Sequence, residues 1–207
     1  EFVMNSLANC YYNGKGTEKN FKKAFYWYQK SAENCNKDAM YNLAMCYKNG
    51  EGTVKNLEKA FYWFQKAAEN ENSNAMFSLA ICHENGEGIV KNLKKAFYWY
   101  QKSAENGNNN AMNNLAICYE NGKGMEKDLE KAFYWYQKAA ENGNNDAMNN
   151  LSVCYRNGKI TEKNLEKVFY WHQKAAENND TFAMNNLGLC YEIGEGTAKN
   201  IKKAFYW

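Results

Sequence analysis

The chain has 207 residues, of which 45% are hydrophobic, and its formal net charge at pH 7 is +3. A charge so close to zero argues against a dedicated nucleic-acid-binding protein, because such proteins carry a marked excess of basic residues. No run of about 18 apolar residues occurs, so no membrane-spanning segment is expected.

Three uncommon residue types recur along the chain with a period of 36 residues. Tryptophan occurs only at Trp27, Trp63, Trp99, Trp135, Trp171 and Trp207. Methionine and cysteine repeat with the same step, from Met4 to Met184 and from Cys10 to Cys190. This shared period indicates repeated units that each pack on their neighbours. We therefore predict one array over residues 1–207, with units at residues 1–36, 37–72, 73–108, 109–144, 145–180 and 181–207, the last of them truncated.

The first predicted helix of each unit carries an apolar stripe, as the fourth unit illustrates. Ala111, Leu115 and Cys118 are spaced i, i+4 and i+7, with Tyr119 beside them, which is typical of a helix with one buried face. This helix should be about 11 residues long. It should end at Gly122, because glycine readily adopts the left-handed conformation that stops a helix. Equivalent glycines lie at Gly14, Gly50, Gly86, Gly158 and Gly194.

The second predicted helix of the fourth unit follows a capping residue, Asp128. Asparagine takes this position in the other units, at Asn20, Asn56, Asn92, Asn164 and Asn200. Leu129, Ala132 and Tyr136 lie on the inward face of this helix, which should run for about 14 residues and end before Gly143. Because the connections are short, the two helices should be antiparallel neighbours. The pattern predicts an all-α solenoid of six tandem helix–turn–helix units.

The cysteines are expected to be free thiols. Neighbouring helices lie roughly 8–10 Å apart, whereas a disulfide requires Cα atoms within about 7 Å, so equivalent cysteines of successive units should not bridge. Cys35 is a seventh cysteine, and an odd number also favours free thiols. Free thiols indicate a reducing compartment, and we predict a cytoplasmic location. Glu1 lies inside a repeat unit, so we expect the natural N-terminus to be missing.

The repeated pattern resembles the Sel1-like repeat family, a relative of the tetratricopeptide repeats. The resemblance covers essentially the whole chain and rests on residues that, in the fourth unit, are Leu115-Ala116, Tyr119, Asn121-Gly122-Lys123-Gly124, Lys131-Ala132, Trp135-Tyr136, Lys138-Ala139-Ala140, Asn142-Gly143 and then Ala147. The fifth unit departs from it, with Ile160 in place of the second loop glycine and Val168 in place of a small alanine. Alanine of the first helix is replaced by Ser152 and Gly188 in the last two units.

The resemblance implies a right-handed superhelix and an adaptor role, since Sel1-like proteins bring other proteins together. It supplies no catalytic residues, so we expect no enzyme, no cofactor and no metal. Secreted bacterial members carry paired cysteines in each repeat, whereas this chain has one. A tetratricopeptide array is the alternative, but its period is about 34 residues. Its signature tryptophan also lies in the first helix, whereas here tryptophan lies in the second.

A candidate binding surface lies on the first helices, which we place on the concave face by analogy with related solenoids. One row on their predicted solvent arc is Asn5, Tyr41, Phe77, Asn113, Asn149 and Asn185. A second row is Ser6, Asn42, Ser78, Asn114, Asn150 and Asn186. Asparagine both donates and accepts hydrogen bonds, so these rows could hold the backbone of an extended peptide. Tyr41 and Phe77 are the best single candidates, because aromatic residues are enriched at binding hot spots.

These rows also have explanations that involve no peptide binding. The asparagines could reflect a compositional bias of the source. An apolar row between the two polar rows could either take peptide side chains or simply pack on the next repeat; it comprises Met45, Ile81, Ile117, Val153 and Leu189.

A row of tyrosines is predicted on the polar arc of the second helices: Tyr26, Tyr62, Tyr98, Tyr134, Tyr170 and Tyr206. It could be a second binding stripe or a contact between molecules. Alternatively, each ring could lie flat beside lysine stems, as amphipathic side chains commonly do.

Several patterns with catalytic associations are better attributed to packing and solvation. The G-x-G loops, such as Gly14-Lys15-Gly16, follow helices rather than strands and lack the rest of a phosphate-binding pattern. His83 and His172 occupy aromatic positions of the repeat, so both should be packing substitutions. The cysteines have no ligand partners at metal-binding spacing. Lysines share their helices with glutamates, which favours a solvated surface over a nucleic-acid track.

The sequence therefore predicts a non-enzymatic scaffold that binds a protein or peptide on the concave first-helix face. The alternative is a structural module that self-associates end to end or side to side into oligomers or filaments. Its contacts would use apolar residues expected to be exposed at the two ends: Leu7, Tyr11, Phe205 and Trp207.

Overall fold

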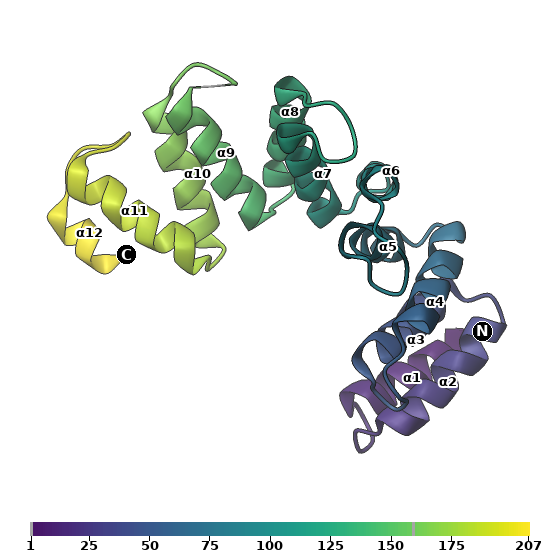
Figure 1. Cartoon of the computed structure of the whole chain (residues 1–207). Coiled ribbons are helices and arrows are strands. Elements are labelled where there is room, and N and C mark those ends of the chain that lie inside the picture. Colours follow the sequence, from purple (N-terminus) through teal and green to yellow (C-terminus); the bar gives the residue numbers. More distant parts are fainter. Residues whose placement is uncertain (1, 159) are drawn as a thin grey trace. The chain divides into compact units, whose positions relative to one another are not determined.

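The computed structural model describes residues 2–158 and 160–207, and over these residues the chain forms twelve α-helices and no strand (Figure 1). The first helix of each repeat, here called the A helix, is α1 (Phe2–Asn13), α3 (Lys37–Asn49), α5 (Ser73–Asn85), α7 (Asn109–Asn121), α9 (Asn145–Asn157) or α11 (Thr181–Ile193). The second, or B helix, is α2 (Phe21–Glu33), α4 (Leu57–Glu69), α6 (Leu93–Glu105), α8 (Leu129–Glu141), α10 (Leu165–Glu177) or α12 (Ile201–Tyr206). The predicted all-helical solenoid of paired helices is confirmed.

The helices fall into two compact units, α1–α6 and α7–α12, and the division lies between two repeats, after Asn108. Within each unit every A helix packs against the B helix of its own repeat, and every B helix packs against the next A helix. Each repeat therefore has hydrophobic partners in itself and in its sequence neighbour, as expected of a solenoid.

Capping residues set where both helices of a repeat begin. The predicted B-helix caps are confirmed; Asp128, for example, accepts a hydrogen bond from the Lys131 backbone N–H at 3.0 Å. The A helices have caps of the same kind that the sequence pattern did not reveal, such as Asn72, which accepts from Ala75 N at 2.8 Å. With these caps, α7 and α8 both have 13 residues. The predicted lengths of about 11 and 14 residues were therefore wrong by one or two residues at the helix ends.

The core of each repeat is built from small and branched side chains around one large aromatic ring. Alanines such as Ala24 and Ala44 are fully buried and let the helices approach closely, and Leu43 fills the space between them. The large buried position on the B helix holds Tyr28, Phe64, Tyr100, Tyr136 or His172. Burying a side chain of this size contributes about 1.5–3 kcal/mol, so this layer supplies much of the stability of each repeat.

The loops that follow α3, α5 and α11 lie directly on the preceding repeat. A Cβ atom added to Gly88 would overlap the backbone oxygen of Leu57 at the start of α4, and one added to Gly52 would overlap that of Phe21. Gly88 also has φ +72, which side chains rarely adopt. The second loop glycine is therefore needed for close contact between repeats, and the fifth repeat carries Ile160 at this position.

Candidate functional site

The first predicted row does lie on the A helices, but its members differ in exposure. Asn185 is exposed, whereas Asn5, Tyr41, Phe77 and Asn149 are half-buried. Asn113 is buried, with 5% of its surface exposed, so its predicted place on the solvent arc is wrong. The neighbouring A helix covers it, and Asn150 Nδ2 donates to Asn113 Oδ1 at 3.0 Å. Of the second row, Ser6 is exposed and the other members are half-buried: Asn42, Ser78, Asn114, Asn150 and Asn186.

The two aromatic candidates are anchored by the buried rings of their own repeats. Tyr41 packs against Phe64, with ring centroids 5.8 Å apart, and Phe77 packs against Tyr100 at 5.9 Å. One edge of each ring stays accessible, because both residues are only half-buried. Fixed aromatic rings of this kind cost little conformational entropy when they bind a partner.

The first unit is hollowed on its A-helix face between α1 and α3. This cavity of about 290 Å³ is lined by Asn9, Asn13, Tyr12, Tyr28, Tyr41, Asn42 and Met45. Tyr28 donates to Asn9 Oδ1 at 2.7 Å, and Tyr12 donates to Glu51 at 2.8 Å. Burial, with the hydrogen bond to Glu51, raises the pKa of Tyr12 to about 12, so its hydroxyl stays protonated near neutral pH. The hollow thus combines aromatic surface with fixed polar groups.

A second hollow, of about 430 Å³, lies on the A-helix face of the second unit. It is lined by Asn113, Asn114, Ile117, Asp146, Asn149, Asn150, Asp180 and Phe182. The amides here bond partly to each other and to Asp180, which accepts from Asn149 Nδ2 at 3.3 Å. The Asn149 side-chain oxygen is buried and accepts no hydrogen bond from the described residues. Some of the predicted peptide-binding amides therefore hold neighbouring A helices together instead.

The apolar row between the polar rows changes character along the chain. Met45, Ile81 and Ile117 are half-buried, whereas Val153 and Leu189 are 45% and 52% exposed. The partial burial of the first three is in keeping with packing, which was one of the two roles considered for this row. The last two present apolar surface to solvent.

The B-helix tyrosines are exposed, as predicted. The exposed fraction of Tyr26, Tyr62, Tyr98, Tyr134 and Tyr170 ranges from 48% to 57%. Each ring meets the following tryptophan edge to face, with centroids 5.0–5.3 Å apart. Lysine ammonium groups lie 5.9 Å from the Tyr62 ring and 6.0 Å from the Tyr170 ring, in keeping with an amphipathic side chain among lysine stems.

The apolar residues expected at the ends are only partly exposed. Phe205 is 95% exposed, but Leu7, Tyr11 and Trp207 are half-buried. The prediction that all four are exposed is therefore wrong, because each of the other three packs within its own repeat or on its neighbour.

Polar contacts lie near the ends of several A helices, some between repeats and some within one, and no sequence pattern had indicated them. Lys48 Nζ lies 2.9 Å from Glu87 of the next repeat, and this contact is the main reason that the pKa of Glu87 is lowered. Tyr136 donates to Glu120 at 2.7 Å within its own repeat. Lys48 is the residue of the second repeat that is equivalent to Glu120. In that repeat the buried ring of the B helix is Phe64, which has no hydroxyl to donate.

Both histidines are buried packing residues, as predicted. His83 meets Phe61 edge to face, and burial lowers its pKa. His172 is 1% exposed and lies 3.5 Å from Arg156 Nη2. Burial, and then the Arg156 charge, lower the pKa of His172 to about 4, so the ring is neutral at pH 7 and can accept from the guanidinium.

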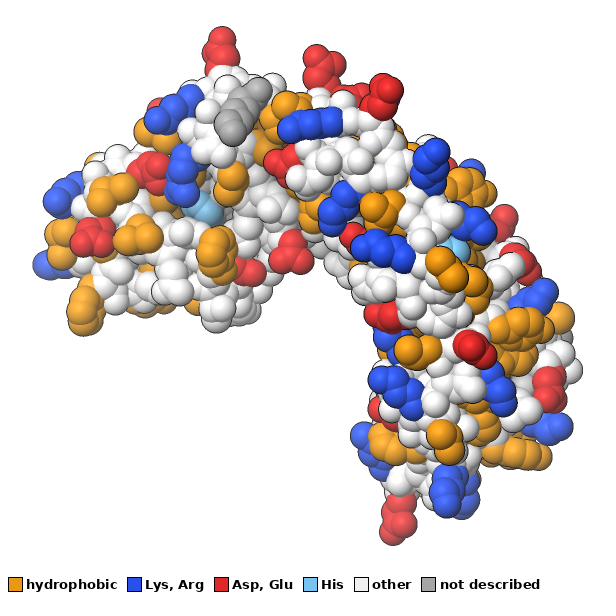
Figure 2. Space-filling model, in the orientation of Figure 1, with side chains coloured by type: hydrophobic (Ala, Val, Ile, Leu, Met, Phe, Trp, Pro, Cys, Tyr) orange, Lys and Arg blue, Asp and Glu red, His pale blue; other side chains and the backbone are white. Residues whose placement is uncertain are grey.

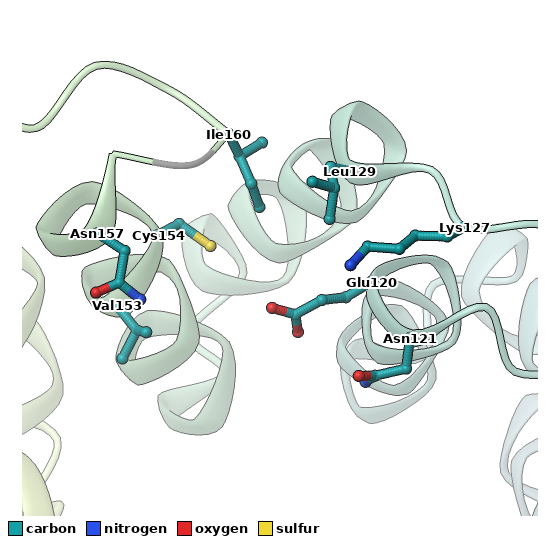
Figure 3. Close-up of a pocket in the computed structure, with 8 residues that line it drawn as sticks. All are labelled: Glu120, Asn121, Lys127, Leu129, Val153, Cys154, Asn157 and Ile160. Carbon is teal, nitrogen blue, oxygen red and sulfur yellow. The ribbon is translucent and has the colours of Figure 1, made fainter.

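A small cavity of about 160 Å³ accompanies the Ile160 substitution. It lies between α7–α8 and α9 and is lined by Glu120, Asn121, Lys127, Leu129, Val153, Cys154, Asn157 and Ile160 (Figure 3). At the equivalent places in other repeats, glycine lets the loop touch the preceding B helix. A side chain cannot occupy that space, which explains the gap beside Leu129.

The described part of the chain contains no group of three or more side chains that could hold a metal ion. None of the seven cysteines, all of which are described, is in a disulfide, and burial raises the pKa of Cys46 to about 12 and those of Cys82, Cys154 and Cys190 to about 11. These four thiols are protonated at neutral pH and are poor nucleophiles. Across the described residues, no helix is long and apolar enough to cross a membrane.

Charges of both signs are interspersed over the visible face of the protein, where basic and acidic side chains alternate rather than gather (Figure 2). The exposed ion pairs follow helix surfaces, as in Lys66 with Glu69 at 3.3 Å. This distribution favours solvated helix surfaces over an electropositive track.

Comparisons with known proteins agree with this architecture. The family model described as Sel1 repeat matches residues 3–34, 37–72, 73–108, 109–144, 145–180 and 181–207. A Sel1 repeat protein from Oxalobacter formigenes is 33% identical, with a TM-score of 0.90 over 100% of this chain and 82% of its own. The protective antigen c5321 of uropathogenic Escherichia coli, which displays an SLR fold, is 28% identical, with a TM-score of 0.91 over 98% of this chain.

This chain spans only 44% of the length of c5321. Helicobacter pylori cysteine rich protein B is 29% identical, with a TM-score of 0.51 over 62% of this chain and 92% of its own. A comparison with curated proteins gives no match.

Proposed function

The chain belongs to the Sel1 repeat family, and on this basis we propose that it is a non-enzymatic scaffold whose A-helix face holds a segment of a partner protein. Because the chain matches the Sel1 repeat family, the alternative assignment as a tetratricopeptide array is not retained. Sel1 repeats generally mediate protein–protein interactions and are generally not catalytic.

The observation that carries the proposal is the pair of hollows on the A-helix faces of the two units. The first combines the Tyr41 ring with the Asn42 amide, and the second combines Asn114 with Ile117. An extended peptide offers backbone donors and acceptors together with alternate side chains. The amide groups of the hollow can form hydrogen bonds with the peptide backbone. The apolar surface beside them can accommodate apolar side chains of the peptide.

Replacing Tyr41 and Phe77 by alanine tests this surface within the first unit. The tagged chain and the Tyr41→Ala, Phe77→Ala variant are used to recover partners from an extract of the source cells. The matched control is Tyr62→Ala with Tyr98→Ala, which removes two aromatic rings from the B helices of the same unit. The proposal expects that the first variant loses the partners and that the control retains them.

Because Tyr41 and Phe77 are half-buried, replacing them by alanine also removes packing contacts. A second variant therefore adds side chains to the same face and leaves these two rings in place. Asn42→Arg with Ser78→Arg places two long charged side chains on the same face and should also abolish recovery. Circular dichroism must show equal helicity for all variants. Partners retained by both A-face variants, or lost from the B-helix control, would remove this face from consideration.

Side-by-side self-association through the B-helix tyrosines is the second candidate function. Its support is the regular exposure of these rings, with 52% of Tyr62 and 50% of Tyr98 accessible. Sedimentation over a range of concentrations separates the two functions. A monomer at every concentration excludes self-association, whereas a dimer that Tyr62→Ala with Tyr98→Ala dissociates supports it.

A further inference from the structure

Successive A helices are joined near their N-termini by a repeated hydrogen bond between side chains. The asparagine that caps one A helix donates through Nδ2 to an oxygen at the second residue of the preceding A helix. Asn72 donates to Asp38 in the first unit and Asn144 to Asn110 in the second, each at 2.9 Å. In these bonds the capping amide is the donor, and where the partner is a carboxylate, as at Asp38, a donor at the capping position is required.

The junction between α9 and α11 breaks this pattern. Asp180 caps α11, and Asp146 is the second residue of α9. Neither carboxylate can donate to the other, so two like charges stand where the Asn72–Asp38 and Asn144–Asn110 junctions have a hydrogen bond. Asp180 Oδ1 instead accepts from Ala183 N at 2.7 Å and from Asn149 Nδ2 at 3.3 Å. Asp146 makes no hydrogen bond or ion pair with the described residues.

Both carboxylates line the hollow of about 430 Å³ on the A-helix face of the second unit. None of the residues that line this hollow is lysine or arginine. Asn149 also lines the hollow, and its Oδ1 is buried and accepts no hydrogen bond from the described residues. Phe182, 62% exposed, also lines the hollow, in the position that holds aspartate or asparagine in the four preceding repeats. The hollow therefore has negative charge, spare acceptors and an aromatic ring, and lacks a cation.

We propose that this hollow binds an arginine side chain of the partner segment. A guanidinium group presents five N–H donors in one plane, which suits several acceptors at once, and its face stacks on aromatic rings. The carboxylates of Asp146 and Asp180 supply the charge, and Phe182 supplies the ring. The inference rests on the proposed scaffold function and names the chemistry of the segment held in the second unit.

Within these 207 residues the single arginine is Arg156, whose Nη2 lies 2.8 Å from Glu195 of its own chain. This arginine is already paired, so we take the occupant to be an arginine of the partner segment.

A labelled peptide tests the inference on the whole chain. The probe is a fluorescein-labelled octapeptide of alternating arginine and leucine, titrated by fluorescence anisotropy. In the matched peptide, citrulline replaces arginine, which keeps the shape of the side chain and removes its charge. The informative variant is Asp180→Asn, which keeps a helix cap and regains a donor toward Asp146. Glu166→Gln, which removes one exposed carboxylate from the first turn of α10, is the control for net charge.

The citrulline peptide and Asp180→Asn should each weaken binding about tenfold or more, the loss expected when a charged hydrogen bond is removed. Glu166→Gln should leave the affinity within about twofold, because an exposed charge contributes little. Equal losses for Asp180→Asn and Glu166→Gln, or equal binding of both peptides, would overturn the inference. Displacement of the peptide by millimolar calcium would assign the carboxylates to a metal ion and would overturn it too.

These outcomes are separate from the test of the scaffold function. If the arginine peptide fails while Tyr41→Ala with Phe77→Ala still abolishes partner recovery, only the inference about arginine falls. If the A-face variants keep their partners, the scaffold proposal falls whichever peptide binds.

Discussion

Arg156, near the end of α9, donates through Nε and Nη2 to both carboxylate oxygens of Glu195, at 3.1 and 2.8 Å. Glu195 lies in the loop after α11, so the pair connects successive repeats. Lys48 and Glu87 make the same connection between α3 and the loop after α5, at 2.9 Å. Repeats of nearly identical sequence thus carry specific polar contacts at their junctions.

Exchanging the charges of Lys48 and Glu87 tests the value of this connection. Lys48→Glu alone places two carboxylates together and should lower the free energy of unfolding by about 1 kcal/mol, a modest figure because the pair is partly exposed. The double exchange, Lys48→Glu with Glu87→Lys, should restore most of the loss. Urea denaturation of the original chain, of Lys48→Glu and Glu87→Lys alone, and of the double variant gives the coupling energy. A double variant no more stable than the single one would show that the pair contributes nothing.

His172 should make stability depend on pH. Burial and the Arg156 charge lower its pKa to about 4, against about 6.5 in the unfolded chain. As the pH falls from about 6.5 to about 4, the unfolded chain binds a proton that the folded chain does not. The free energy of unfolding therefore decreases over this window, by up to about 3 kcal/mol.

His172→Phe keeps a ring in the core and removes this titration. The melting temperature of the original chain should fall more between about pH 7 and about pH 5 than that of the variant. Identical pH dependence in the two proteins would contradict the assigned burial of the neutral imidazole.

Gly88→Ala should disrupt the contact between the second and third repeats. Its φ is +72, and its new Cβ would overlap the Leu57 backbone oxygen, which cannot move without shifting α4. We expect a loss of more than about 2 kcal/mol. Gly107→Ala is the matched control, because φ is +83 and nothing lies within 4 Å of the new Cβ. Equal losses of stability at both positions would mean that the positive φ, and not the contact with Leu57, is the reason that glycine is needed there.

Asn72→Asp should copy the paired carboxylates of the last junction into the first unit. It removes the donor that now bonds to Asp38 at 2.9 Å and puts two like charges together, at a cost of about 1–3 kcal/mol. Asn164→Asp is the control, because the equivalent B-helix cap in the fourth repeat is already Asp128. Thermal unfolding should show a lower melting temperature for the first variant alone. Equal effects would indicate that aspartate is simply a poorer cap.

The elements that the sequence predicted well depend on local rules. The B-helix caps such as Asp128 and the stop glycines such as Gly50 follow from the chemistry of a few adjacent residues. The burial of Asn113 could not be predicted in this way, because it depends on how the next A helix packs over it. Among the candidate binding residues, Tyr41 and Asn42 do line a hollow.

Contacts between residues some 34 to 39 positions apart were also out of reach of local patterns. The Asp146–Asp180 pair shows why. Each aspartate is ordinary in its own helix turn, and the pair becomes visible only when its position is compared with the Asn72–Asp38 bond in the folded chain. To find such a pair, one must compare the residue pairs that meet at successive boundaries between repeats, and not only the equivalent single residues of the repeats.

Site-specific photocrosslinking can decide whether the A-helix face holds the partner. Benzoylphenylalanine is placed at Asn42 or Asn186 on the A helices, and at Gln65 or Gln137 on the B helices, and each protein is irradiated in the source cells. We expect discrete covalent adducts from both A-helix positions and none from the two B-helix positions. Adducts from Gln65 and Gln137 alone would show that the partner binds the opposite helices, and the scaffold proposal in its present form would fail.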